Sequence, residues 1–211
     1  MSKVAVYQQF RERLMSGELL PGQFVTQKEL AELAGVPVAT AREAIQKLEH
    51  ESLLKIHPQR GIQITDVTTK FIREAFGVRM VMELSAVRNL ASGEHVDAVR
   101  QLLSDTRKVL EQARESASDS LLEKAVEVDW EMHDQIIDRM GNDLLSEIYR
   151  VNAARLRLIK VNNRLSTDRA IRALEEHVTV LEHCERGEPE EASRALEKHL
   201  LIAMDRALQG K

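Results

Sequence analysis

The sequence predicts a mainly α protein in two parts: an N-terminal winged helix-turn-helix, residues 1–66, followed by an antiparallel six-helix bundle, residues 67–211. Three observations predict this class. The composition combines 43% hydrophobic residues with only 3% aromatic residues and four prolines, which favours helices. The first 66 residues alternate short helical runs with a hairpin pattern. From Thr68 onward the pattern changes to long amphipathic runs with short breaks.

The N-terminal part follows the order helix, helix, turn, helix, hairpin. A helical pattern begins at Val4 and ends near Gly17. The segment "TQKELAELAGVPVATAREAIQKLEHE" contains two short helices, and Gly35 suits the left-handed turn between them. Two short strands, Leu53–Ile56 and Ile62–Thr65, flank the loop "HPQRG". This order is typical of a winged helix-turn-helix.

The C-terminal part contains six helical runs separated by cap and turn residues. Gly187 lies just past one helix and Pro189 just inside the next, which is the usual asymmetry of helix ends. Six helices of this length, joined by short loops, form an antiparallel bundle. The predicted runs are residues 68–92, 94–116, 120–140, 142–162, 168–186 and 189–209.

Charge, cysteine content and hydropathy limit the class of protein. The net charge is -4, and residues 1–66 carry 8 Lys and Arg against 8 Asp and Glu, so the negative excess belongs to the bundle. A neutral N-terminal part can still bind phosphates if its cations share one face. The one cysteine, Cys184, forms no internal disulfide. No apolar run approaches the roughly 20 residues that cross a bilayer, so we expect a cytoplasmic protein.

The stretch "VEVDWEMHDQIIDRMGN", residues 126–142, places a carboxylate and an imidazole among inward-facing residues. Asp129 and His133 are four residues apart and therefore neighbours on one helix face. His199 lies on the apolar stripe of the last helix, and His177 on the shoulder of the stripe before it. These four side chains, from three helices, are able to converge inside the bundle. Three imidazoles and a carboxylate suit a first-row divalent metal, although a single buried histidine is more often a hydrogen-bonded core residue.

The sequence resembles the GntR-type bacterial transcription regulators that have a C-terminal FCD domain. The N-terminal resemblance runs through "SGELLPGQ", "KELAELAGV", "AREAIQKLE" and "HPQRGIQIT". The C-terminal resemblance runs through "RMVMEL", "DWEMHDQIIDRMGN", "LEEHVTVLEHCERGEPEEA" and "KHL". One departure is "PVATAR", where Val38 stands at a position at which the family often has an arginine. The resemblance implies a DNA-binding regulator that senses a ligand, and operator preference could differ from that of typical members.

Candidate DNA contacts follow from this resemblance and from the geometry of helix-turn-helix proteins. The N-terminal residues of a recognition helix lie nearest to base edges and phosphates, which places Thr40 and Arg42 there. Arg42 can contact guanine or a phosphate, or it can pair with Glu43 or Glu49 on the surface. Lys28 begins the preceding helix, where family members hold the DNA backbone. Arg60 and Gly61 lie at the tip of the wing, and the alternative there is a simple turn.

Candidate metal and effector residues lie in the bundle. Many FCD domains place one Asp and three His at positions that match Asp129, His133, His177 and His199. Four protein ligands leave room on an octahedral ion for an oxygen ligand, which fits Zn, Ni, Mn or Fe better than a closed structural zinc site. Arg79 either pairs structurally with Glu83, four residues on, or presents its fork to a small molecule's carboxylate. Asn152 and Arg155 lie on or beside the inward stripe of their helix and could line the same cavity.

These observations predict a transcription regulator, and repression is the expected mode. A homodimer would bind a palindromic double-stranded operator, with half-sites about 34 Å apart. A small organic acid held near the metal would be the effector. Two alternatives remain open: a regulator that senses the ion itself, and a metalloenzyme that activates water on the ion. The enzyme hypothesis has no evident additional general base beside the proposed ligands, so we do not expect an enzyme.

Overall fold

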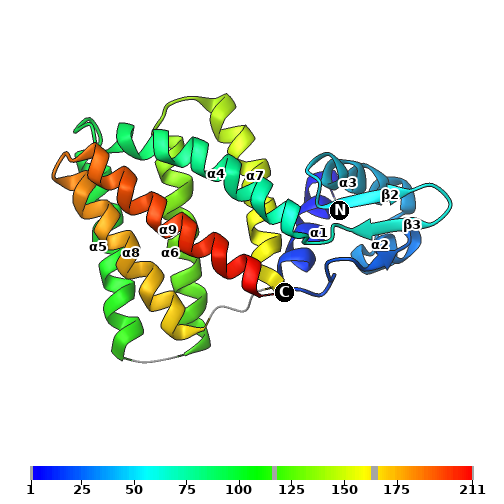
Figure 1. Cartoon of the computed structure of the whole chain (residues 1–211). Helices are drawn as coiled ribbons and strands as arrows, with labels where there is room; N and C mark the ends of the chain where they lie inside the picture. Colours follow the sequence, from blue (N-terminus) through cyan, green and yellow to red (C-terminus); the bar gives the residue numbers. More distant parts are fainter. Residues whose placement is uncertain (1, 116–117, 163–165, 211) are drawn as a thin grey trace. The chain divides into compact units, whose positions relative to one another are not determined.

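The computed structural model describes residues 2–115, 118–162 and 166–210. These residues form nine helices and three strands (Figure 1). The elements are α1 (Lys3–Met15), β1 (Phe24–Val25), α2 (Gln27–Ala34), α3 (Val38–His50), β2 (Leu54–His57), β3 (Gly61–Ile64), α4 (Thr69–Leu90), α5 (Val96–Glu115), α6 (Asp119–Asp138), α7 (Asp143–Asn162), α8 (Thr167–Glu185) and α9 (Pro189–Gln209).

The described residues divide into two compact units. The first contains residues 2–75 and 151–162, and the second contains residues 76–150 and 166–209. The first turns of α4 and the second half of α7 therefore group with the N-terminal elements. The predicted boundary after residue 66 stays a prediction, and residue 116, the predicted end of the second bundle helix, lies outside the described residues.

In the first unit, helices α1, α2 and α3 pack around an apolar core. Thr26 caps α2: its hydroxyl accepts from the Glu29 amide, and the Glu29 carboxylate accepts from the Thr26 amide. Gly35 ends α2 at φ 62°, in the left-handed region that suits glycine, and the chain turns directly into α3. The fully buried core side chains include Phe10, Leu14, Leu30, Ile45 and Leu48.

The wing is a three-stranded antiparallel sheet with strand order β1-β3-β2. Ile62 of β3 is paired with Ile56 on one side and Val25 on the other. The hairpin strands are shifted by about one residue from their predicted bounds. The two-residue strand β1 was not predicted, because so short a strand has no alternating pattern to recognise.

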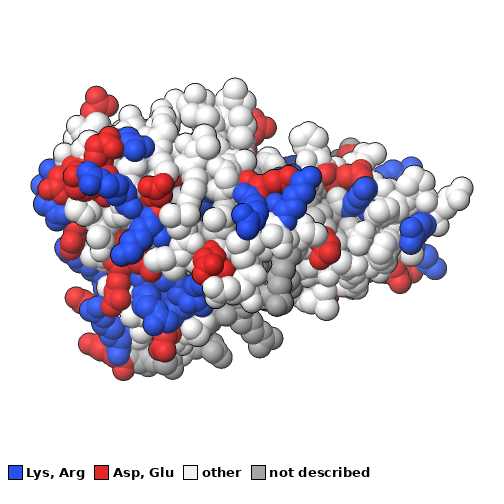
Figure 2. All heavy atoms as spheres, in the orientation of Figure 1, with Lys and Arg blue, Asp and Glu red and all other residues white. Residues whose placement is uncertain are grey.

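In the second unit, α8 contacts α5, α6 and α9. Three ion pairs run along α5 and α8: Arg100 with Glu185, Arg107 with Glu182 and Arg114 with Glu175. Residue numbers rise on one helix as they fall on the other, so these two helices are antiparallel. On the face shown in Figure 2, positive and negative side chains interleave over this unit.

The structure confirms the predicted fold class: a small winged helix-turn-helix followed by six long helices, within the described residues. The six long helices begin and end within about two residues of their predicted bounds, since cap residues set those ends. Within the same residues, none of the helices has both the length and the apolar character needed to cross a membrane.

Candidate metal centre and recognition helix

The structure brings together the four predicted metal ligands. Asp129 and His133 come from α6, His177 from α8 and His199 from α9. One ligand atom from each residue lies within 4.8 Å of the others. The three imidazoles are 0 to 3% exposed, and Asp129 is 8% exposed. Side chains that lie up to 70 positions apart in the sequence thus form one buried cluster in the second unit.

The nitrogens of the cluster are arranged as a set of metal donors requires. Nε2 of His177 lies 3.2 Å from Nε2 of His199 and 3.6 Å from the nearer Asp129 carboxylate oxygen. Two nitrogens bound to one ion at about 2.0–2.1 Å lie about 3 Å apart when their bonds are perpendicular. Nε2 of His133 is buried and has no hydrogen-bond partner within the described residues. The residues present therefore fit a divalent ion.

The protonation of the imidazoles also suits metal binding. Burial, reinforced by the charge of Arg79, lowers the pKa of His133 to about 4. Burial and the neighbouring His199 imidazole hold the pKa of His177 well below its usual value. Both rings are therefore neutral near pH 7, and a neutral imidazole has the lone pair that a metal binds.

Glu83 of α4 supports His133 through a hydrogen bond to Nδ1 of the ring. Its Oε2 lies 2.8 Å from Nδ1 of His133, while its Oε1 accepts from Arg79 Nε at 2.6 Å and from the Tyr149 hydroxyl at 2.5 Å. Burial alone would raise the pKa of Glu83, but the charge of Arg79 and the hydrogen bonds from His133 and Tyr149 lower it to about 2. Glu83 is thus an ionised carboxylate with 0% exposure.

Glu176 of α8 holds His199 in the same way. Its Oε2 lies 2.6 Å from Nδ1 of His199, and Arg169 donates to both of its oxygens, at 2.8 and 2.9 Å. Burial raises the pKa of Glu176, but hydrogen bonds from His199 and Arg169 outweigh it and lower the pKa to about 2. Glu176, Arg169 and Tyr149 are not predicted from the sequence. A signal existed for two of them, since Arg169 and Glu176 are seven residues apart and share a face of α8.

The predicted effector residues lie in different units. Arg79 belongs to the second unit, pairs with Glu83, and has a buried Nη2 without a partner among the described residues. Asn152 and Arg155 belong to the first unit. The Asn152 amide donates to the Ala75 carbonyl at 2.9 Å, and the Arg155 guanidinium lies 5.6 Å from the centre of the Phe71 ring. Their role in effector binding stays a prediction.

The predicted DNA contacts lie on α2, α3 and the wing. Arg42 is exposed on the second turn of α3, and no ion pair engages it within residues 2–115, 118–162 and 166–210. Thr40, on the first turn, is half-buried. The Lys28 side chain is 81% exposed and lies 3.7 Å from Glu32. The structure leaves the cation of Arg42 available to a ligand in solution.

At the wing tip, Arg60 is exposed and lies over the ring of Phe24, 5.9 Å from its centre. Gly61 has a φ of 101°, and a Cβ there would come within 2.9 Å of the Val25 carbonyl oxygen. The glycine is therefore required by the close approach of β1, whether or not the wing contacts DNA.

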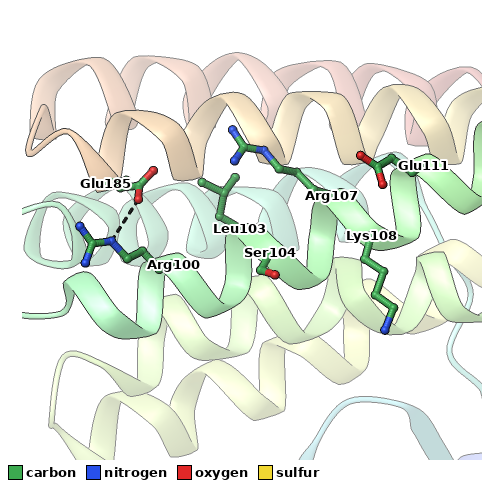
Figure 3. Close-up of a pocket in the computed structure, with 7 residues that line it drawn as sticks. All are labelled: Arg100, Leu103, Ser104, Arg107, Lys108, Glu111 and Glu185. Atoms are coloured by element: carbon green, nitrogen blue, oxygen red, sulfur yellow. Dashed lines mark hydrogen bonds and ion pairs between the residues drawn. The ribbon is translucent and has the colours of Figure 1, made fainter.

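A surface depression of about 460 Å³ lies elsewhere, along α5 and α8 (Figure 3). It is lined by Arg100, Leu103, Ser104, Arg107, Lys108, Glu111 and Glu185. Figure 3 shows Arg100 bonded to Glu185, and Arg107 pairs with Glu182. None of the predicted site residues lines this depression, and its charges largely neutralise each other, so we assign it no ligand.

Both parts of the chain match known families. Residues 3–64 match the family described as bacterial regulatory proteins, gntR family, and residues 74–201 match the FCD domain. The uncharacterized HTH-type transcriptional regulator YdhC of Bacillus subtilis is 24% identical over 92% of this chain and 85% of its own length. The HTH-type transcriptional repressor RspR of Escherichia coli is 22% identical over 92% of this chain and 84% of its own.

Solved structures share the fold. E. coli McbR/YncC superposes with a TM-score of 0.74 at 19% identity, covering 98% of this chain and 97% of that one. The Zn²⁺-bound FCD domain of TM0439 superposes with a TM-score of 0.54 at 21% identity, covering 68% of this chain and 95% of that one.

Proposed function

The chain belongs to the gntR family of bacterial regulatory proteins and has an FCD domain, and on that premise we propose that it is a ligand-controlled transcriptional repressor. The family places it among DNA-binding regulators and not among enzymes. In this proposal α3 and the wing bind an operator in the cytoplasm. The second unit holds a divalent ion and a small organic acid, and the acid changes the affinity for the operator. The repressor named RspR supports the direction of control.

The observation that carries the ligand-sensing part is the buried cluster of Asp129, His133, His177 and His199. An apolar core gains nothing from three imidazoles and a carboxylate, since each buried polar atom needs a partner. Nε2 of His133 has none among the described residues. The zinc-bound FCD domain of TM0439 supports the assignment of an ion, and Zn, Ni, Mn and Fe all suit this donor set.

Arg79 is the residue that we propose to bind the acid. Its Nε is held by Glu83, while its buried Nη2 has no acceptor among the described residues. A buried N–H without an acceptor is costly, and a ligand carboxylate would satisfy it with a charge-assisted hydrogen bond. The ion, when bound, supplies a second anchor for a carboxylate oxygen. Asn152 and Arg155 are further candidate contacts on the evidence of the sequence alone.

A homodimer is part of the proposal. Large apolar side chains are exposed on the second-unit parts of α4 and α7, and the hydrogen bond from Tyr149 to Glu83 joins these two helices. The exposed residues are Val78, Val81, Leu144 and Ile148. Burying them against a second copy would remove apolar surface from water. Two recognition helices would then bind half-sites about 34 Å apart, and a coupling of about 1–3 kcal/mol to the acid would switch occupancy.

Elemental analysis and DNA binding test the proposal together. The full chain, purified without a metal-affinity tag, is assayed for bound metal, and its co-purified small molecules are identified by mass spectrometry. Operator affinity is then measured for the metal-free protein, the zinc-loaded protein, and the zinc-loaded protein with a panel of mono-, di- and tricarboxylates. We expect one ion per chain and a change in affinity with one of the acids. A change with zinc alone would identify the ion itself as the signal.

Variants at Arg79 separate acid binding from folding. Arg79→Ala would leave the Glu83 carboxylate buried without its cation, which costs about 3–5 kcal/mol of stability. Arg79→Lys keeps the charge but not the fork of donors. We expect Arg79→Lys to retain the zinc content and thermal stability of the wild type and to bind the organic acid more weakly. An unchanged affinity for the acid would remove Arg79 from the proposed site.

A further inference from the structure

Two arginine–glutamate–histidine chains, each a series of hydrogen-bonded side chains, lead to the metal cluster. In one, Arg79 pairs with Glu83, and Glu83 bonds Nδ1 of His133. In the other, Arg169 pairs with Glu176, and Glu176 bonds Nδ1 of His199. The order in each is arginine, glutamate, histidine, and the two chains use different helices: α4 and α6 in the first, α8 and α9 in the second.

The hydrogen bond at Nδ1 decides which histidine nitrogen can bind a metal. An ionised carboxylate only accepts hydrogen bonds, so the nitrogen facing it must carry the proton. The pairing with an arginine keeps each glutamate ionised. A neutral imidazole with its proton on Nδ1 has its lone pair on Nε2. Both chains therefore present Nε2 to the cluster, in a fixed tautomer and ring orientation.

The third histidine has no such support. Nδ1 of His177 is buried and has no hydrogen-bond partner within the described residues. Its Nε2 lies between Nε2 of His199 and the Asp129 carboxylate. No carboxylate therefore fixes Nδ1 of this ring among the described residues, whereas a charged acceptor holds Nδ1 of the other two rings.

We propose that Glu83 and Glu176 are positioning residues of this cluster, each fixing one histidine with Nε2 as its ligand atom. The inference rests on the proposed metal centre and adds the residues that set its affinity. Neither glutamate is a ligand: each acts through the ring nitrogen that faces away from the ion. Metal affinity in such sites commonly falls about 10- to 100-fold when the outer carboxylate is removed.

The two glutamates differ in how cleanly each can be tested. The Glu83 side chain is 0% exposed and accepts from Arg79, Tyr149 and His133 at once. Its removal would disturb all three partners. The Glu176 side chain is 25% exposed and serves only Arg169 and His199 in the hydrogen bonds of the described residues. Glu176 is therefore the better position for a decisive variant.

The experiment compares zinc affinity of the full chain, measured by competition with a chelator, for the wild type and Glu176→Gln. Glutamine has nearly the shape of glutamate but no charge, and its amide can donate as well as accept, so it no longer fixes the proton on Nδ1. We expect zinc binding about 10- to 100-fold weaker. The matched control is Glu175→Gln, which changes the neighbouring residue of α8, whose carboxylate pairs with Arg114 and not with a histidine. The control should keep the wild-type affinity.

A second variant guards against loss of folding, because Glu176→Gln leaves Arg169 buried beside a neutral side chain. The double variant Arg169→Met/Glu176→Leu replaces the whole ion pair by apolar side chains, a change that proteins often tolerate. It should unfold at a temperature near that of the wild type and still bind zinc at least about 10-fold more weakly.

A spectroscopic measurement separates positioning from a general structural effect. In the metal-free wild type, nitrogen NMR of the imidazoles should find the proton of His199 on Nδ1. In both variants at Glu176 the same ring should shift to the other tautomer or to a mixture, while His133 keeps its proton on Nδ1.

Each outcome decides the inference. Folded Glu176 variants that bind zinc like the wild type, or that keep the His199 tautomer unchanged, would refute the positioning role and leave the metal centre intact. A wild-type chain that takes up no zinc, nickel, manganese or iron would overturn the proposed metal centre and this inference with it. A selective loss of zinc affinity and of the tautomer in the Glu176 variants would establish it.

Discussion

The two units of this chain treat their charged residues in opposite ways. In the first unit, the cations predicted to contact DNA are exposed, and the core is almost wholly apolar. In the second unit, the buried Arg, Asp, Glu and His side chains among the described residues are Arg79, Glu83, Asp129, His133, Arg169, His177 and His199. The first unit therefore has its charged side chains mainly on the surface, whereas the second unit has many of them in its interior.

This difference matches the size of the ligand proposed for each unit. A DNA duplex is too large to be enclosed, so a protein reads it with exposed side chains that stay solvated until binding. An ion or a small acid can be surrounded, and a desolvated site strengthens each electrostatic contact with it. Buried charge is costly unless it is paired, and the second unit pairs it in two arginine–glutamate–histidine chains.

The largest expected effect concerns the buried charge. His177→Ala removes the ring whose Nε2 faces both His199 and Asp129. We expect zinc affinity to fall by more than about 100-fold, since even outer partners of such ligands are worth about 10- to 100-fold. Elemental analysis of the purified variant checks this. His183→Ala is the matched control on α8, because that ring pairs with Glu188; retention of one ion per chain by His177→Ala would contradict the cluster.

The next effect concerns the exposed charge. Arg42→Ala removes an exposed guanidinium from the second turn of α3. A direct base contact of this kind is worth about 1–3 kcal/mol, so operator binding should weaken about 5- to 150-fold at constant salt. Fluorescence anisotropy with a selected operator measures it. Arg107→Ala, an equal loss of charge from α5, should bind the operator normally, and zinc content should be unchanged in both. Equal operator affinities of the two variants would disprove the docking of α3.

A smaller effect concerns Glu51, a buried carboxylate in the otherwise apolar core of the first unit. The Tyr7 hydroxyl donates to both of its oxygens. Tyr7→Phe should lower the free energy of unfolding by about 1–3 kcal/mol, because Glu51 loses its donor. Burial, with the hydrogen bond to Glu51, raises the pKa of Tyr7 from 10.0 to about 12.

The raised pKa of Tyr7 gives this stabilisation a pH dependence with a definite sign. Folding favours the protonated hydroxyl, so the stabilisation is complete below the unfolded pKa of 10.0 and is lost as the pH rises through about 12. Denaturant unfolding of wild type and Tyr7→Phe across this range should give a difference that is constant below pH 10 and shrinks above it. A difference that grows with pH would mean that folding favours the ionised Tyr7 hydroxyl, which would contradict its hydrogen bond to Glu51.

The smallest effect is that of Lys28→Ala. The Lys28 side chain is 81% exposed and makes only a 3.7 Å pair with Glu32, so the fold should not change. Loss of one phosphate contact should weaken binding to all DNA sequences alike and reduce the slope of log affinity against log salt by about 1. Binding measured at several salt concentrations detects this. An unchanged slope would place Lys28 outside the DNA interface.

Much of the fold could be predicted because its signals are local. Gly187 and Pro189 mark the end of one helix and the start of the next. The apolar stripes repeat with the helical period, so residues close in the sequence indicate where each long helix begins and ends. The inward direction of Asp129, His133 and His199 follows from the same period. By contrast, β1 is two residues long, and its pairing with β3 depends on residues almost 40 positions away.

The sequence by itself determined the short N-terminal helices, the long C-terminal helices and which polar side chains point inward, because helix period and caps act over a few residues. Only the tertiary structure decided that Glu176 hydrogen-bonds His199, that Glu83 hydrogen-bonds His133, and that Nδ1 of His177 has no partner among the described residues. Those partners lie on different helices, or their choice depends on how helices pack. Hydrogen bonds of buried charges are set by such neighbours in space, which no periodicity along one helix records.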